Sequence, residues 1–314
     1  MTESTRPNAL ERLAWFTLGW NILVILWGAV VRATGSGAGC GAHWPMCNGE
    51  VIPPSPTLAT LIEFSHRATS GIALLLVAAL LSQVRRRLEK GHLARFWATA
   101  SMLLILSEAA IGAGLVLFER VAGDTSTSRG FWISGHLINT FLLLAALTLT
   151  ARFVGSARSA PAGVAGALKA TFPRSLDQWP ARLAVLALIA TGISGAIAAL
   201  GDTLFKAATI REAIAQDFSS ASHIFLRLRI LHPLIAVAGG GLILFLAYRL
   251  ISLNPARPAA RRRGQWLCGL VLAQWFLGLV NLLLLAPTWL QIVHLFVADL
   301  IWMSLILALS DQSA

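Results

Sequence analysis

Eight apolar segments, each of about 20 residues, constrain this chain more than any other feature of its sequence. About 20 residues of helix cross a hydrocarbon layer of roughly 30 Å, and in lipid a single segment can bond all its backbone groups internally only as a helix. Charged residues make up 12% of the chain, about half of the share in a typical soluble domain. We therefore predict an all-α integral membrane protein with eight transmembrane helices. The predicted spans are about 13–32, 60–82, 96–118, 131–151, 183–201, 230–250, 266–286 and 289–309.

Basic residues collect in alternate connections between these spans. Those of the N-terminal tail and of the connections after spans two, four and six are Arg6, Arg12, Arg85, Arg86, Arg87, Lys90, Arg95, Arg152, Arg158, Lys169, Arg174, Arg182, Arg249, Arg257, Arg261, Arg262 and Arg263. Lys and Arg concentrate in cytoplasmic loops, so this pattern predicts that both termini are cytoplasmic. The net charge of +11 then reflects topology and anionic lipid, and we expect no nucleic-acid partner. The first apolar run is too long for a signal peptide and the N-terminal tail is unlike a transit peptide, so we expect neither and predict a prokaryotic plasma membrane.

An internal repeat divides the chain into two halves. Residues 63–67 align with 229–233, and residues 108–112 align with 274–278, both at an offset of 166 residues. Four crossings return the chain to the side where it started, so the two copies run parallel. We predict two pseudo-symmetric four-helix bundles. The units are an N-terminal half over 1–152, a cytoplasmic linker over 153–182 and a C-terminal half over 183–314.

Each half carries one histidine in its second span and one in its fourth. These four are His66, His136, His232 and His294. Both spans run inward from the outer face, so the four histidines are predicted at similar depth in the outer part of the membrane. Facing imidazoles at one depth suit the two axial ligands of a haem iron. A lone membrane histidine could instead bond a neighbouring helix, but the repeated pairing favours haem. The remaining histidines, His43, His92 and His223, lie in connections, and we expect them to be solvated.

Cys40 and Cys47 both lie in the first outer connection. The oxidising side of the membrane permits a disulfide between them, which could be structural or redox-active. A metal site formed by these two cysteines and His43 is the alternative, although three ligands would leave it incomplete.

A carboxylate distinguishes the two halves. Glu63 precedes His66 by three residues and shares its helical face. It could accept a proton or stabilise positive charge during oxidation of a bound haem. The alternative is a simple ion pair with Arg67. Glu108, in the third span, is a weaker candidate for a proton path.

The repeat equivalent of Glu63 is Arg229, a cation that could pair with a haem propionate, as could Arg227. The N-terminal half is therefore predicted to be catalytic and the C-terminal half to hold a cofactor.

Several motifs, in this order along the chain, resemble those of haem A synthase. They are Gly28-Ala-Val-Val-Arg-Ala-Thr-Gly-Ser-Gly37, the loop from Cys40 through Trp44-Pro-Met-Cys47, Glu63-Phe-Ser-His-Arg67, Leu231-His-Pro233 and Ala286-Pro-Thr-Trp-Leu-Gln-Ile-Val-His-Leu295. The resemblance covers essentially the whole chain, and the cysteine pair is typical of the disulfide-bearing type of the family.

This resemblance implies oxidation of the C8 methyl group of haem O to a formyl group, which gives haem A for terminal oxidases. It implies that His232 and His294 hold a haem b cofactor, and that His66 and His136 receive the substrate. Expected partners are haem O synthase, an electron acceptor or donor, and the lipid bilayer. Two other functions stay open: a di-haem b electron carrier that uses quinone, and a non-catalytic haem transporter or chaperone.

Overall fold

The structure is a computed structural model that describes residues 8–161, 163–172, 179–252 and 258–310. Eight of its helices are long and apolar enough to cross a membrane, and the described residues contain no β-strand, which confirms the predicted fold class. Of the basic residues that define the predicted topology, Arg6, Arg174 and Arg257 lie outside the described residues.

The first four spans form a closed ring. They are α1 (Ala9–Ala33), α2 (Leu58–Arg87), α3 (Leu93–Leu117) and α4 (Thr127–Val154). Each packs on the next, and α4 returns to α1. Polar caps fix where these helices begin: Asn8 and Glu11 form a capping box on α1, while Thr57 and Ser126 accept backbone N–H groups of α2 and α4.

The last four spans repeat that ring. Its helices are α6 (Trp179–Leu204), α9 (Leu231–Ser252), α10 (Pro258–Leu283) and α11 (Thr288–Ser310). Helix α6 packs on α9, α9 on α10, α10 on α11, and α11 on α6. The order of contacts therefore makes α6, α9, α10 and α11 the counterparts of α1, α2, α3 and α4. The shorter helices are η1 (Ser36–Ala38), α5 (Val164–Thr171), α7 (Ile210–Phe218) and α8 (Ile224–Arg229).

The sixth span begins earlier than predicted and is broken near its start. Helices α8 and α9 together form a span of 29 residues from Ile224 to Ser252, with the interruption at Ile230. Pro233 causes this break, because proline has no N–H to donate to the carbonyl of Arg229 and its ring crowds that carbonyl. His232 is therefore the second residue of α9, whereas its counterpart His66 lies within the unbroken α2.

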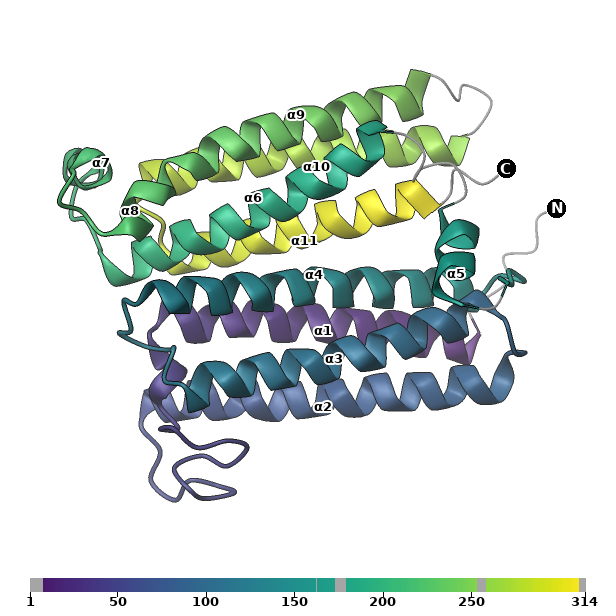
Figure 1. Cartoon of the computed structure of the whole chain (residues 1–314), viewed down its shortest axis with the longest axis horizontal. Helices are drawn as coiled ribbons and strands as arrows, with labels where there is room; N and C mark the ends of the chain where they lie inside the picture. The colour runs from purple at the N-terminus through teal and green to yellow at the C-terminus, as the bar shows by residue number, and fades with distance from the viewer. Residues whose placement is uncertain (1–7, 162, 173–178, 253–257, 311–314) are drawn as a thin grey trace.

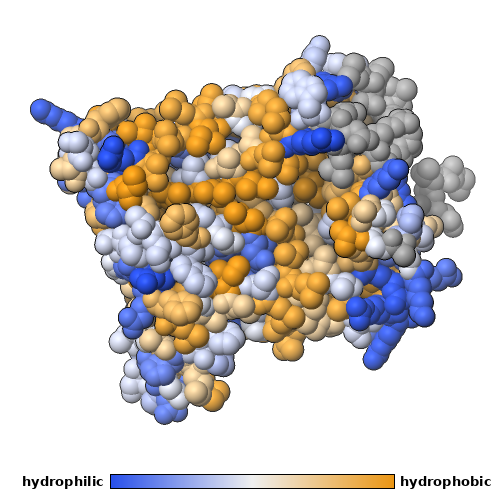
Figure 2. Space-filling model, viewed as in Figure 1, coloured by the Kyte–Doolittle hydropathy of each residue, from blue (hydrophilic) through white to orange (hydrophobic). Residues whose placement is uncertain are grey.

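Connections gather at two opposite ends of the molecule (Figure 1). Helix α1 begins and α11 ends at one of them, which we call the inner end after the predicted topology. Helices α7 and α8 and the loop that precedes α2 lie at the other, the outer end. On the face shown in Figure 2, apolar side chains cover most of the middle and hydrophilic residues concentrate towards the ends. This distribution fits a multi-pass membrane protein; which side is cytoplasmic stays a prediction.

Helix α4 lies at the centre of the protein. In its most apolar window 78% of the residues are buried inside the protein, because α4 contacts α1, α3, α6 and α11. Trp302 of α11 donates its indole N–H to the carbonyl oxygen of Phe141 on α4, and the two rings are stacked with centroids 5.0 Å apart. The halves thus share a tightly packed apolar interface.

Arg32 joins the two halves near the outer end. It belongs to α1, yet its guanidinium donates to the carbonyl oxygen of Ala199 at 2.8 Å and to the hydroxyl of Thr203 at 2.9 Å, both on α6. It also donates to the amide oxygen of Gln291 on α11 at 2.9 Å. A charged donor with three acceptors from the opposite half fixes how the halves are aligned.

We predict that Arg32 and Gln291 are energetically coupled. In a double-mutant cycle with Arg32→Ala and Gln291→Ala, we expect a coupling free energy of roughly 1–3 kcal/mol, because the bond involves a charged donor. The measurement is unfolding of the purified protein in detergent. Arg12→Ala is the matched control, since Arg12 is an exposed residue of the same helix. Additive single effects would show that this contact does not hold the halves together.

Candidate functional site

The four histidines lie on opposite corners of the two rings. His66 is on α2 and His136 on α4, while His232 is on α9 and His294 on α11. All four lie in the outer part of their spans, since α2, α4, α8–α9 and α11 begin at the outer end. The repeat therefore places one histidine pair in each half.

The C-terminal pair fits two ligands of one iron. The ring centroids of His232 and His294 are 6.4 Å apart and the ring planes are at 83°. When two imidazoles bind the same metal ion from opposite sides, each through a ring nitrogen at about 2 Å, their ring centres lie about 6 Å apart. The pair therefore has the spacing of a bis-imidazole site across the interior of the ring.

Each histidine of the C-terminal pair contacts a polar group of a neighbouring helix. Nδ1 of His232 is 3.1 Å from the hydroxyl of Ser194, and Nε2 of His294 is 3.1 Å from the amide nitrogen of Gln274. Nδ1 of His294 is buried without a hydrogen-bond partner among the described residues. A buried ring nitrogen left unbonded is costly, which is consistent with a ring whose partner is a bound group.

Glu108 lies beside His136 in the N-terminal half. Its Oε1 is 3.5 Å from Nε2 of His136 and also accepts the hydroxyl of Thr140. Its Oε2 accepts the side-chain amide of Asn139, whose own oxygen accepts Ser107. Nδ1 of both His66 and His136 is buried and unbonded within the described parts of the chain. Glu108, the weaker candidate on sequence grounds, is thus the carboxylate in contact with a predicted haem histidine.

Glu63 bonds both to the outer loop and to Arg67. It is only 3% exposed, its Oε2 accepts the backbone N–H of Cys40 at 2.8 Å, and its Oε1 accepts Arg67. Arg67 also donates to the carbonyl oxygens of His43 and Met46, both at 2.7 Å. The ion pair considered as the alternative role of Glu63 is therefore present, and the pair attaches the loop to α2.

The two loop cysteines form a disulfide. Cys40 and Cys47 are bonded, with Cα atoms 4.4 Å apart. The alternative metal site is therefore wrong, because neither sulfur is free and His43 is exposed. Gly39 brings this loop against α2: a Cβ there would lie 2.4 Å from the carbonyl carbon of Ala59. Only glycine permits that approach.

Arg229 is held by two carboxylates that the sequence did not indicate. It bonds to Asp202 at the end of α6 and to Asp217 of α7, so it links these two helices at the outer end of the C-terminal half. Arg227, two residues earlier, is exposed.

Two connection histidines are caps rather than solvated side chains. His92 is 8% exposed, caps α3, and its Nε2 is 2.6 Å from the carbonyl oxygen of Ser156. His223 caps α8 and stacks on Phe205 with centroids 5.0 Å apart. The expectation of solvation fails for both, because each fills the end of a helix.

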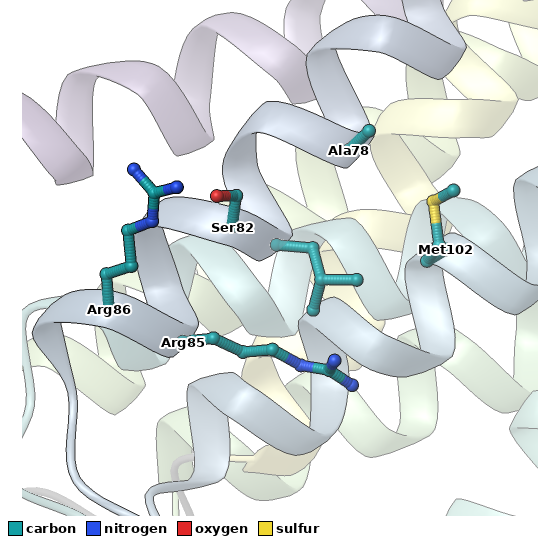
Figure 3. Close-up of a pocket in the computed structure, with 6 residues that line it drawn as sticks. Ala78, Ser82, Arg85, Arg86 and Met102 are labelled. Atoms are coloured by element: carbon teal, nitrogen blue, oxygen red, sulfur yellow. The ribbon is translucent and has the colours of Figure 1, made fainter.

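A hollow of about 360 Å³ lies elsewhere, at the inner end of α2 and α3 (Figure 3). Arg85, Arg86 and Ser82 line it on one side, and apolar residues such as Ala78 and Met102 line the other. Since a helix rises 1.5 Å per residue, Ala78 is about 18 Å along α2 from His66. This hollow is therefore separate from the histidine sites.

Comparison with known proteins gives two kinds of match. Residues 11–306 match the COX15-CtaA family, described as cytochrome oxidase assembly protein. A protein of Thermus thermophilus named protoheme IX farnesyltransferase is 47% identical over 299 residues, which are 94% of this chain but 47% of that protein.

Shorter matches lead to proteins named heme A synthase. Those of Shouchella clausii and of an Exiguobacterium species are 44% identical over 111 residues and 36% identical over 145 residues. The aligned parts are 35% and 44% of this chain, and 37% and 46% of those proteins. This chain thus aligns with about half of its Thermus relative and with less than half of each of the other two.

We predict that protein isolated without reductant resists alkylation at Cys40 and Cys47. Under denaturing conditions Cys268, a free cysteine, should be alkylated at once and serves as the internal control. Both loop cysteines should react only after reduction, which mass spectrometry of the loop peptide measures. Two alkylated loop thiols in freshly isolated protein would contradict the pairing and the predicted outer position of the loop.

Proposed function

The chain belongs to the COX15-CtaA family of cytochrome oxidase assembly proteins, and from this premise we propose that it is a haem A synthase. The proposed reaction oxidises the C8 methyl group of haem O, the substrate, to the formyl group of haem A. The observation that carries the proposal is a pair of repeat-related histidine sites, of which only the N-terminal one has carboxylates, Glu63 and Glu108, at the repeated positions. The shorter matches of the chain are to proteins named heme A synthase.

The C-terminal half is the proposed cofactor site. His232 and His294 would hold haem b, which supplies one-electron redox chemistry when bound. Ser194 and Gln274 orient the two imidazoles. Arg229 is fixed by Asp202 and Asp217, so the exposed Arg227 is the better placed of the two arginines to pair with a propionate.

The N-terminal half is the proposed substrate site. His66 and His136 would bind the haem O iron, and Glu63 is the proposed catalytic carboxylate. Each oxygen of a carboxylate can accept more than one hydrogen bond, so Glu63 keeps free lone pairs beside its contacts with Cys40 and Arg67. The counterpart of Glu63 is the cation Arg229, and that difference is what assigns the chemistry to this half.

We propose haem O synthase as a partner. The relative from Thermus thermophilus is about twice as long as the aligned region and is named for farnesylating protohaem IX. Haem O is a farnesylated haem, so an enzyme of that class would supply the substrate proposed here. Oxidation of a methyl group also releases electrons, which an acceptor must take up. We place the protein in a prokaryotic plasma membrane with the disulfide loop outside.

We predict that His232→Ala and His294→Ala each abolish the low-spin haem b spectrum, because one axial imidazole is lost. Wild-type protein should carry haem b together with haem O or an oxidised product, as measured by extraction and mass spectrometry. His223→Ala is the matched control: this histidine lies at the same end of the same half and is not a proposed ligand. Wild-type spectra at full haem occupancy in both variants would remove the cofactor assignment. Two equivalents of unmodified haem b in the wild type would favour an electron carrier. Recovery of the substrate haem in chemically unchanged form would favour a transporter.

We predict that Glu63→Gln keeps haem binding but lowers haem A formed per folded molecule by roughly 10²-fold or more. The amide preserves shape but cannot accept a proton near neutral pH. Thr60→Val is the control for loosening of the loop, because Thr60 donates its hydroxyl to the carbonyl oxygen of Gly39 at 2.9 Å and carries no charge. If Glu63→Gln gives less folded protein but normal product per folded molecule, Glu63 is structural. Equal losses in both variants would mean that Glu63 acts by holding the loop.

A further inference from the structure

Every predicted haem histidine faces a glycine on the helix that precedes it in its ring. The ring-facing glycines are Gly28 on α1, Gly112 on α3, Gly195 on α6 and Gly278 on α10, opposite His66, His136, His232 and His294. In all four pairs the ring atom nearest to the glycine is Cε1, the carbon between the two nitrogens. The same contact therefore occurs four times, between α1 and α2, α3 and α4, α6 and α9, and α10 and α11.

The four contacts differ in how much room they leave. A Cβ built on Gly195 would lie 2.9 Å from Cε1 of its histidine, and one on Gly28 would lie 3.0 Å away. The same distance is 3.3 Å at Gly278 and 4.0 Å at Gly112. Real Cβ atoms essentially never lie closer than 3.0 Å to another atom, so alanine at Gly195 would displace the imidazole or the helix. At Gly28 and Gly278 the contact would be unusually tight, and the histidine ring would have to move by a few tenths of an ångström.

Helix propensity does not account for these glycines. Glycine in a helix interior costs about 1 kcal/mol relative to alanine, and all four lie inside long helices. The spaces around other helical glycines are different: Gly241 of α9 has nothing within 4 Å of a built Cβ, and Gly240 faces the indole of Trp275. The distinctive property of the ring-facing glycines is contact with a histidine ring.

We propose that Gly28, Gly195 and Gly278 are positioning residues for the haem ligands. Each leaves the space in which one imidazole ring packs against a helix backbone, and this contact limits where the iron-binding nitrogen can lie. The inference rests on the proposed function, because it takes the four histidines to be ligands. Within that function it distinguishes the halves: both rings of the cofactor pair are closely confined, whereas His136 in the substrate half has a looser contact and Glu108 beside it.

The variant that tests this proposal is Gly195→Ala. A metal ligand must be held within about 0.5 Å of its productive position, and mutation of groups that orient a ligand typically costs about 10–100-fold in metal affinity. We therefore expect the affinity for haem b per folded molecule to fall by about 10-fold or more. Any haem that remains should show a shifted low-spin electron paramagnetic resonance signal, since this signal reports the orientation of the axial imidazoles. Gly28→Ala should instead lower bound haem O and haem A and leave haem b unchanged.

Two glycines on α9 supply matched controls. Gly241→Ala adds the same methyl group in open space and should leave haem content, resonance signal and folded yield at wild-type values. Gly240→Ala presses on Trp275 rather than on a histidine, so it should lower the folded yield while each folded molecule keeps a normal signal. At Gly278 a built Cβ would lie 3.3 Å from Cε1 of His294, which leaves more room than at Gly195. Gly278→Ala should therefore fold and still shift the resonance signal. It replaces Gly195→Ala as the test variant if Gly195→Ala yields no folded protein.

The possible failures can be told apart. If His232→Ala loses haem b while Gly195→Ala and Gly278→Ala keep wild-type content and signal, the positioning role is wrong and the proposed function stands. If His232→Ala itself keeps haem b, the ligand assignment of the proposed function is wrong. If Gly240→Ala shifts the signal as strongly as Gly195→Ala, general packing damage explains the effect and the positioning role is again wrong.

Discussion

The absence of water from the hydrocarbon layer is the constraint on which this structure depends. Every backbone polar group within it must be bonded inside the protein, so each span is a helix and specificity can come only from side chains between helices. The one break within a described span, at Ile230, lies near the outer end, three residues before Pro233. Some polar side chains in the spans bond to a carbonyl of their own helix, as Ser101 does to Trp97. Others join neighbouring helices, as Glu108 of α3 does with Asn139 and His136 of α4.

Equivalent positions in the two halves keep their geometry and change their charge. The same cyclic order of four helices presents a histidine on its second and fourth members, while Glu108 is replaced by Gln274 and Glu63 by Arg229. Such a duplication lets one backbone design hold two similar ligands and treat them differently. Helix α4 is buried because it contacts α6 and α11 as well as its own ring, so the two rings pack directly on each other.

The sequence was sufficient to predict the eight spans and the cysteine pairing, because apolar length and a short loop between two cysteines are local signals. It also raised the Glu63–Arg67 pair as an alternative, since residues four apart on a helix are neighbours. It could not predict that Asp202 and Asp217 bind Arg229, or that His92 is buried against Ser156. Those contacts depend on how the ends of the helices meet in the folded protein. The hydrophobic periodicity of the sequence carries no information about that arrangement. Of the ring-facing glycines, Gly28 began a sequence motif and Gly112 aligned with Gly278 in the repeat, but nothing in the sequence indicated that they contact histidine rings.

Arg32 has a consequence for the order in which the protein can be assembled. Its acceptors on α6 and α11 are separated from it by 167 to 259 residues of chain, so they are synthesised long after α1 has entered the membrane. Until α6 is in place, the guanidinium can remain near the outer headgroups, where water and lipid phosphates can bond it. The two acceptors on α6 become available first, and the bond to Gln291 can form only after α11 has entered the membrane. The full set of bonds around Arg32 therefore marks completion of the bundle, and a chain arrested before α11 would lack the last of these acceptors.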